Sequence, residues 1–238
     1  MSFKDEDILA FDTATGAWSM HFDGSDVGVT ADLNAFYVQS NGSVLMSFQQ
    51  STSIGSLGAV DDSDIVRFIP TSVGANTVGT FELYFDGSDV GLTRSGEDID
   101  ALYLLSDGRL VISTVGNHSV PGASGRDEDL TIFTPSALGS STSGTWAVYF
   151  DGSDVGLSNS SPEDVNGTWV DEATGDIYLS TVGSFGVTGS SGDGADIFVC
   201  HPSSTGPSTS CSFGPGLYWD GSEHGFAGEI LDAFFIDR

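Results

Sequence analysis

The sequence predicts an all-β fold, a four-bladed β-propeller built from repeats of about 66 residues. Three observations predict it: a turn motif that recurs along the chain, four strand-like segments in each complete repeat, and the lack of a convincing helical pattern. In this interpretation residues 1–238 form a single domain, and the ring closes by pairing its N-terminal and C-terminal strands.

Two landmarks define the repeat. The motif FDGSDVG and its diverged copy WDGSEHG occupy residues 22–28, 85–91, 150–156 and 219–225. The second landmark is a polar residue inside an apolar segment, found at Asn34, Asp100, Asn166 and Asp232. Both landmarks divide the chain into four units, and the length differences between units fall in the loops.

Each complete unit contains four predicted antiparallel strands. In the best-formed copy they cover residues 101–106, 109–114, 129–135 and 144–150, with turn residues between them. The chain begins with segments of the third and fourth kind and ends, at residues 229–237, with a segment of the first kind. The two ends are therefore expected to share a fourth blade that lacks a clear second strand, which would hide open sheet edges.

The FDGSDVGL turns and four-strand units resemble bacterial secreted β-propeller repeat proteins across nearly the whole chain. This resemblance implies a secreted or extracellular protein, with the export signal absent from this chain. The WD dipeptide of WD40 repeats and the double glycine of kelch repeats are missing, so their partners are not expected here. A β-solenoid and a sandwich of two repeats are the alternative folds.

The charge limits the partners. The net charge is −28, from 34 acidic and six basic residues. Such a field repels nucleic acid and anionic membranes and attracts cations. No segment approaches 18 consecutive apolar residues, so membrane insertion is not expected.

Cys200 and Cys211 are the two cysteines of the chain. They flank a Pro/Ser/Thr loop between two predicted strands, and we expect a disulfide that staples this hairpin in an oxidising compartment. Two free thiols are the alternative. A metal pair is not expected, because no suitable cysteine or histidine cluster accompanies them.

The acidic residues recur at three places in the repeat, which antiparallel geometry puts on one face. Ca²⁺ suits them because it accepts six to eight oxygen ligands in flexible geometry. The sequence thus predicts up to one Ca²⁺ site per blade. The candidate ligands are Asp5, Asp7, Asp62, Asp64, Asp127, Asp129 and Asp196 before the third strand, Asp23, Asp26, Asp86, Asp89, Asp151, Asp154, Asp220 and Glu223 in the turn motif, and Glu97, Asp98, Glu163, Asp164 and Glu229 before the first strand.

Two other interpretations of the acids stay open. Asp and Asn side chains cap tight turns by bonding nearby backbone, so the motif could be turn chemistry alone. A halophilic scaffold without specific metal sites would also be acidic, although its acids should be scattered rather than clustered.

The polar landmark lies in the first strand of each unit, which is the innermost strand of a propeller blade. Asn34, Asp100, Asn166 and Asp232 are therefore predicted to form an axial ring around a cation or ordered waters. The alternative is that each side chain hydrogen-bonds the backbone of a neighbouring blade.

No catalytic constellation is evident, so an enzyme is not expected. The histidines, which are expected at surfaces or turns, occupy different positions in the repeat: His21, His118, His201 and His224. The expected function is a Ca²⁺-binding extracellular structural or ligand-binding module, with a glycan or protein ligand on the acidic face. A lectin-like module with exposed aromatic platforms and a glycan-acting hydrolase with a carboxylate pair are the alternatives.

Overall fold

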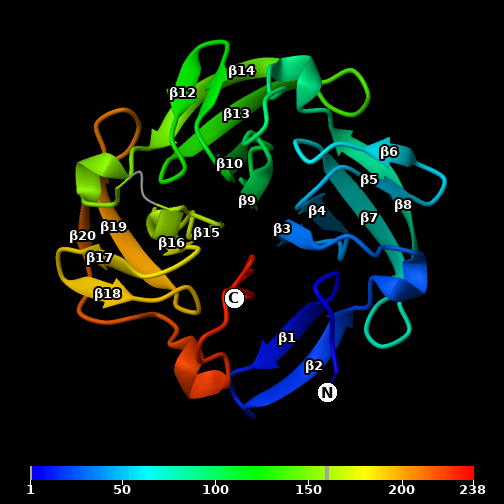
Figure 1. The fold of residues 1–238 in the computed structure, drawn as a ribbon, viewed down its shortest axis with the longest axis horizontal. Helices are drawn as coiled ribbons and strands as arrows, with labels where there is room; N and C mark the ends of the chain where they lie inside the picture. Colours follow the sequence, from blue (N-terminus) through cyan, green and yellow to red (C-terminus); the bar gives the residue numbers. More distant parts are fainter. Residues whose placement is uncertain (1, 159–160) are drawn as a thin grey trace.

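The protein is all-β in the computed structural model, which describes residues 2–158 and 161–238. Helical segments in these ranges are limited to short 3₁₀ turns. Three four-stranded antiparallel sheets and the N-terminal two-stranded hairpin lie around a common centre (Figure 1). The N-terminus lies beside this hairpin, and the C-terminus lies near the centre (Figure 1).

The three large sheets repeat one strand order. The first sheet contains β3 (Leu33–Val38), β4 (Val44–Phe48), β7 (Ile65–Ser72) and β8 (Val78–Phe85). The second contains β9 (Ile99–Leu104), β10 (Leu110–Thr114), β13 (Leu130–Ala137) and β14 (Ser143–Phe150). The third contains β15 (Gly167–Val170), β16 (Ile177–Ser180), β19 (Phe198–Ser204) and β20 (Ser210–Phe213). The four predicted strands per complete unit are thus confirmed.

Smaller elements connect these sheets. The N-terminal hairpin consists of β1 (Ile8–Asp12) and β2 (Ala17–Phe22). Short 3₁₀ turns follow the last strand of each unit: η1 (Ser25–Val27) after β2, η2 (Ser88–Val90) after β8, η3 (Ser153–Val155) after β14 and η5 (Gly221–His224) after β20. A further turn, η4 (Ser161–Glu163), precedes β15. The long segments after β4, β10 and β16 form further hairpins, β5 (Thr52–Ile54) with β6 (Gly58–Val60), β11 (His118–Val120) with β12 (Ala123–Gly125), and β17 (Phe185–Val187) with β18 (Ser190–Gly192).

The core lies between sheets as well as within them. Every residue of β4, β10 and β16 is buried, as expected for strands covered on both faces. β9 contacts both β3 and β15, so the first strands of the three sheets are neighbours near the centre. Side chains that enter this centre are consequently brought together from different sheets.

The predicted C-terminal strand is not present, and the ring is not closed by pairing terminal strands. Residues 229–238 contain no strand, although the Leu231 N–H donates to the Gly194 carbonyl at 2.8 Å. In the complete sheets the second strand lies between the first and the third. The fourth unit has no second strand, so nothing bridges this segment to β1. It packs instead through Phe234, Phe235 and Ile236 against the core around the third sheet.

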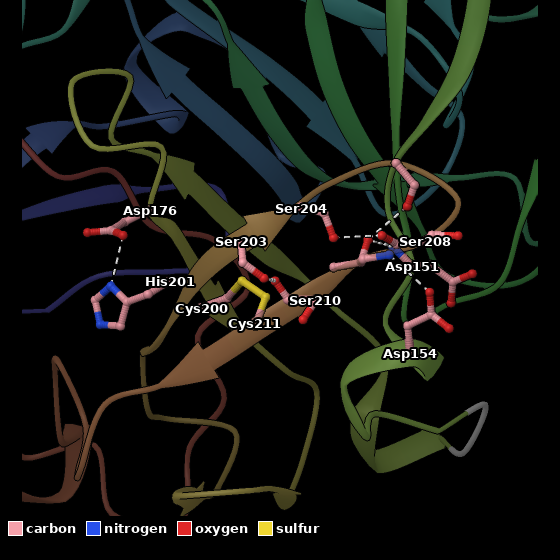
Figure 2. Close-up of a disulfide and its surroundings, with 12 residues drawn as sticks. Asp151, Asp154, Asp176, Cys200, His201, Ser203, Ser204, Ser208, Ser210 and Cys211 are labelled. Carbon is pink, nitrogen blue, oxygen red and sulfur yellow. Dashed lines mark hydrogen bonds and ion pairs between the residues drawn. A yellow bond between two sulfur atoms is a disulfide. The ribbon is translucent and has the colours of Figure 1, made fainter.

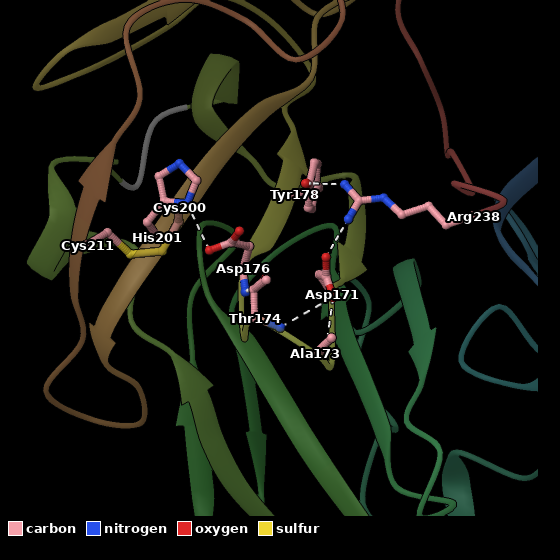
Figure 3. Close-up of polar contacts among 9 residues, drawn as sticks. All are labelled: Asp171, Ala173, Thr174, Asp176, Tyr178, Cys200, His201, Cys211 and Arg238. Atoms are coloured by element: carbon pink, nitrogen blue, oxygen red, sulfur yellow. Dashed lines mark hydrogen bonds and ion pairs between the residues drawn. A yellow bond between two sulfur atoms is a disulfide. The ribbon is translucent and has the colours of Figure 1, made fainter. Parts of the chain in front are cut away.

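Arg238 fastens the end of this tail. Its guanidinium donates to the Asp171 carboxylate and to the Tyr178 hydroxyl (Figure 3). The same group lies over the Trp169 ring, 4.9 Å from its centroid. A delocalised cation of this shape makes both kinds of contact at once.

The disulfide replaces a packing pair that the other sheets use. In the second sheet the Phe133 ring covers Gly144, where an added Cβ would lie 2.5 Å from the ring. In the third sheet the equivalent positions carry Cys200 and Cys211, which form a disulfide with their Cα atoms 5.4 Å apart (Figure 2). A covalent bond thus takes the place of an aromatic contact across the same hairpin.

The first glycine of each turn motif is required by a close backbone approach. Gly152 has an ordinary φ of −66°, but an added Cβ would lie 2.3 Å from the Glu128 carbonyl oxygen. The equivalent glycines meet the backbone in the same way: Gly24, Gly87 and Gly221. The turn after each fourth strand is therefore pressed onto the segment that precedes the third strand.

We expect Gly152→Ala to lower the free energy of unfolding by about 1–3 kcal/mol, because the new methyl group forces this contact apart. Gly186→Ala is the matched control, since a Cβ there meets nothing within 4 Å and its φ is not positive. Urea unfolding of both variants measures the difference. Equal stability of the two would contradict the close approach at Gly152.

Candidate functional site

The turn motif fastens each large sheet to the unit before it. Between the first and second sheets, the Thr142 N–H donates to Asp89 Oδ2 at 2.9 Å. The Thr142 hydroxyl accepts from the Asp86 N–H at 2.9 Å and donates to the Gly139 carbonyl at 2.7 Å. We call this set of bonds the amide latch.

The amide latch occurs at three junctions. The Thr77 N–H donates to Asp26 at 2.8 Å, and the Thr209 N–H donates to Asp154 at 3.0 Å (Figure 2). The first aspartate of each motif accepts a hydroxyl hydrogen bond of 2.7 Å from the motif serine, as seen at Asp23, Asp86 and Asp151. The predicted ligands in these motifs therefore all have protein donors.

The acids at the start of the third strands are also bonded to backbone. Asp129 accepts from the N–H groups of Gly152 and Arg126, each at 2.8 Å. Equivalent bonds are made by Asp7, Asp64 and Asp196. These carboxylates thus anchor the same turn whose glycine packs so closely.

The acids before the first strands are less uniform. Glu97 accepts from three backbone N–H groups, and Glu163 accepts from two. Glu229, which also precedes a predicted first strand, is exposed. In the diverged turn motif, Asp220 accepts from the Ser222 N–H and hydroxyl, whereas Glu223 is exposed. These bonds match the turn-chemistry interpretation, and a Ca²⁺ role for these residues stays a prediction.

A different environment surrounds four acids near the centre, which we call the inner carboxylate cluster: Asp100, Asp127, Glu128 and Asp164. Asp100 comes from β9, and the others come from the segments before β13 and β15. Asp100 and Asp164 are 2% and 7% exposed, and Glu128 is 0% exposed. Among the described residues, six carboxylate oxygens of this cluster are buried and accept from no N–H or hydroxyl group, including both oxygens of Asp100 and of Glu128. Their hydrogen-bonding neighbours are other carboxyl groups, Asp164 beside Asp100 and Asp127 beside Glu128.

The pKa values of the cluster reflect this burial. Burial raises the pKa of Asp100 well above its usual range, and the nearby Asp164 charge adds to the effect. Burial and then the Asp127 charge raise the pKa of Asp164 to about 8. The pKa of Glu128 is raised to about 7, first by burial. Arg126 is the basic group at this end of the cluster, with its Nη1 atom 3.8 Å from Glu128.

A second set of acids occupies the equivalent positions at the opposite junction. Asp232 is exposed to solvent. The protein around it still raises its pKa, first by desolvation and then through the charges of Asp5 and Asp32. In the repeat these three residues correspond to Asp100, Asp127 and Asp164. The two acidic junctions thus share one arrangement.

The other two junctions carry asparagine in place of the landmark aspartate. Asn34 donates from Nδ2 to the Ile99 carbonyl at 3.0 Å, and Asn166 donates to the Leu231 carbonyl at 2.7 Å. Asn34 and Asn166 therefore bond the next unit's backbone, as in the alternative to an axial ring. An ionised aspartate cannot donate this bond.

Sequence reasoning missed Glu128 and Asp32 as candidate ligands. Both belong to the recurring acidic clusters, but Glu128 corresponds to Ser63 and Ala195 in other units, so the repeat does not single it out. Among residues 2–158 and 161–238, no group of three or more His, Cys, Asp or Glu side chains has the geometry to hold a metal ion. The cluster is a concentration of buried carboxylates rather than a preformed metal cage.

His118 does not follow the prediction that histidines lie at surfaces or turns. It lies in β11, is 4% exposed, and contacts the hydroxyl groups of Thr114 and Thr131 through its two ring nitrogens at 3.1 and 2.6 Å. Burial lowers the pKa of His118, and the Glu97 charge opposes that shift. The folded protein consequently favours the neutral ring.

Comparisons with known proteins give little support for an assignment. No family model matches the chain, and no curated protein matches it. Among the solved structures that match is the extracellular domain of a candidate one-component system from B. thetaiotaomicron, with 12% identity and a TM-score of 0.23. The match covers 82% of this chain and 25% of that one.

Within the described ranges, no helix has the length and apolar character needed to cross a bilayer.

The buried His118 predicts a pH dependence. Because the pKa of His118 is lower in the folded than in the unfolded chain, its contribution to stability is present above about pH 6.5 and is lost as the pH falls towards the folded-state pKa. The slope reaches at most about 1.4 kcal/mol per pH unit. We expect the difference in unfolding free energy between the wild type and His118→Gln to shrink from pH 7 to pH 5, and a difference that stays constant would contradict this.

Proposed function

We propose that this chain is a calcium-binding four-bladed β-propeller that serves as an extracellular structural or ligand-binding module. The arrangement of three similar sheets and a hairpin around one centre supports the propeller (Figure 1). The amide latch between successive units supports it further, because blades of a ring need a repeated junction. The fourth blade is the irregular one, made by β1, β2 and the C-terminal tail.

The inner carboxylate cluster carries the calcium proposal. Buried carboxylates are costly unless a cation or hydrogen-bond donors compensate them. Asp100 is the decisive residue, because both of its oxygens are buried, accept from no N–H or hydroxyl group of the described residues, and have the carboxyl group of Asp164 as their hydrogen-bonding neighbour. Its neighbours Asp127 and Asp164 supply further oxygens of the kind that Ca²⁺ binds. Binding draws these side chains together, since they are not yet arranged as a metal cage.

The repeat favours two strong sites rather than four. The polar landmark position of the repeat is an aspartate in two units, Asp100 and Asp232. Asp100 lies near Asp127 and Asp164, and Asp232 lies near Asp5 and Asp32. At the other two junctions Asn34 and Asn166 supply an amide donor in place of the buried aspartate. Acids remain at the Asn34 junction, where burial and the charges of Asp62 and Asp61 raise the pKa of Asp98. The proposed ligands Asp127 and Asp164 are among the sequence-based candidates, Asp100 joins them from the predicted axial ring, and the acids of the DGSD turns are left out of the set.

We expect Ca²⁺ to raise the melting temperature of chelator-treated protein by roughly 5–11 °C when free Ca²⁺ is about 100 times its Kd, since a ligand of the folded state alone adds about 2.7 kcal/mol. Asp100→Asn should reduce this rise. In chelator the same variant should be more stable than the wild type by about 1 kcal/mol, because the new amide can donate to the next unit as Asn34 does. Thermal unfolding followed by circular dichroism measures both effects.

The control is Asp89→Asn, which changes a turn acid whose carboxylate already accepts from Thr142. It should keep the full response to Ca²⁺. If Asp89→Asn removed the Ca²⁺-dependent rise in melting temperature and Asp100→Asn preserved it, the ligands would be the turn acids, and the inner-cluster proposal would be contradicted. A melting temperature that rises with ionic strength, with no preference for Ca²⁺, would indicate a salt-adapted scaffold and contradict the proposal.

A further inference from the structure

The junction between the third sheet and the β1–β2 hairpin lacks the amide latch. Its turn motif carries Glu223 in place of the latch aspartate. The β1–β2 hairpin is also short, with strands of five and six residues, whereas β7 and β8 have eight each. Within the described residues, no hydrogen bond links the Glu223 side chain or the Asp220 N–H to this hairpin, so the junction is left open.

Three aromatic residues at this junction repeat the packing of a buried trio elsewhere. Trp219, Phe11 and Trp18 correspond in the repeat to Phe85, Phe133 and Trp146 between the first and second sheets. The centroids of Phe11 and Trp18 are 4.8 Å apart and those of Trp18 and Trp219 are 6.2 Å apart, against 4.6 and 6.1 Å in the buried trio. The buried trio is at most 7% exposed, whereas the rings of Phe11, Trp18 and Trp219 are all partly exposed.

The exposed trio lines an open pocket of about 700 Å³. This volume lies within the range of small-molecule sites. Tyr218, Glu223 and His224 also line it, and the His224 ring stacks on Trp219 at 3.8 Å. The pocket therefore combines aromatic surface with a carboxylate at the place where the other junctions are filled by a hairpin turn.

Three polar groups around the opening have no partner among the described residues: the Asp220 N–H, the Glu223 carboxylate and the Trp18 indole N–H. The indole N–H of Trp219 also lacks a partner, but it is buried. At the latched junction Thr142 satisfies the first two of these positions with its hydroxyl and its amide. The third is satisfied there by the Val90 carbonyl, which accepts from Trp146 Nε1 at 3.0 Å. The open junction thus offers two donors and one acceptor beside aromatic rings.

We propose that this pocket binds a neutral carbohydrate through one pyranose ring. A sugar hydroxyl both donates and accepts, so neighbouring hydroxyls can serve the Asp220 and Trp18 N–H groups and the Glu223 carboxylate together. The apolar face of the ring packs on the exposed aromatic surface. A quaternary ammonium ion would match the carboxylate and the rings but would leave both N–H groups without an acceptor.

The negative charge of the pocket and of the whole chain favours neutral over anionic sugars. Glu223 lies in the pocket of a chain with a net charge of −28, which repels uronic acids and other anionic sugars. The site is separate from the inner carboxylate cluster and shares no residue with it. Sugar binding is therefore expected in chelator as well as in Ca²⁺, and its failure would leave the calcium proposal standing.

The test uses maltotriose, cellotriose, mannotriose and chitotriose as neutral probes, with trigalacturonate and tetramethylammonium chloride as charged comparators. Each is titrated into the full chain in chelator and in Ca²⁺, followed by tryptophan fluorescence and calorimetry. We expect at least one neutral probe to bind saturably and trigalacturonate not to bind. Glu223→Gln should weaken binding about tenfold or more, because it removes a charge-assisted hydrogen bond.

Two variants complete the test. Trp18→Leu should also weaken binding about tenfold or more, through the lost ring face. Glu82→Gln, which changes a half-buried acid on β8 that pairs with Arg67 outside the pocket, should leave binding unchanged. Glu223 is exposed, so Glu223→Gln remains decisive even if Trp18→Leu does not fold. Failure of all neutral probes at millimolar concentration, full binding by Glu223→Gln, or binding of tetramethylammonium alone would overturn the proposal.

Discussion

The carboxylate that accepts a backbone N–H across a junction is the interaction on which the rest of the structure depends. At each amide latch the turn after one unit is bonded to the last hairpin of the next, through pairs such as Asp89 and Thr142. The glycine of the same turn lets the backbone approach the segment before the third strand. These fixed junctions set the spacing of β3, β9 and β15 near the centre and so bring their acidic flanks together.

The inner carboxylate cluster is a consequence of that spacing. The turn acids are satisfied by amides, whereas the inner acids have other carboxyl groups as neighbours and one basic group, Arg126, beside Glu128. The repeat resolves this in two ways, with an asparagine donor at Asn34 and Asn166 and an aspartate at Asp100 and Asp232. Departure from symmetry also explains the open pocket, because a short hairpin at the last junction exposes an aromatic trio that is buried elsewhere.

Much of the strand pattern was predictable, because the turn motif and the alternating strand segments mark each complete unit. The C-terminal strand was predicted wrongly, since sequence pattern does not reveal that a segment without a second strand has nothing to pair with. The inner cluster was predicted in part: Asp100, Asp127 and Asp164 were candidates, but Glu128 was missed. Sequence position alone does not distinguish acids that accept hydrogen bonds from backbone N–H groups from acids without such a donor, because these hydrogen bonds depend on contacts between units. His118 was misplaced for the same reason.

Anomalous diffraction from crystals grown with Ca²⁺, or with Tb³⁺ in its place, tests the central claim most directly. The account predicts a strong anomalous peak within coordination distance of Asp100, Asp127 and Asp164, with the carboxylates drawn around it, and a second peak beside Asp232. Peaks confined to the DGSD turns would contradict the account. So would an empty inner cluster whose carboxyl groups hydrogen-bond one another in saturating metal.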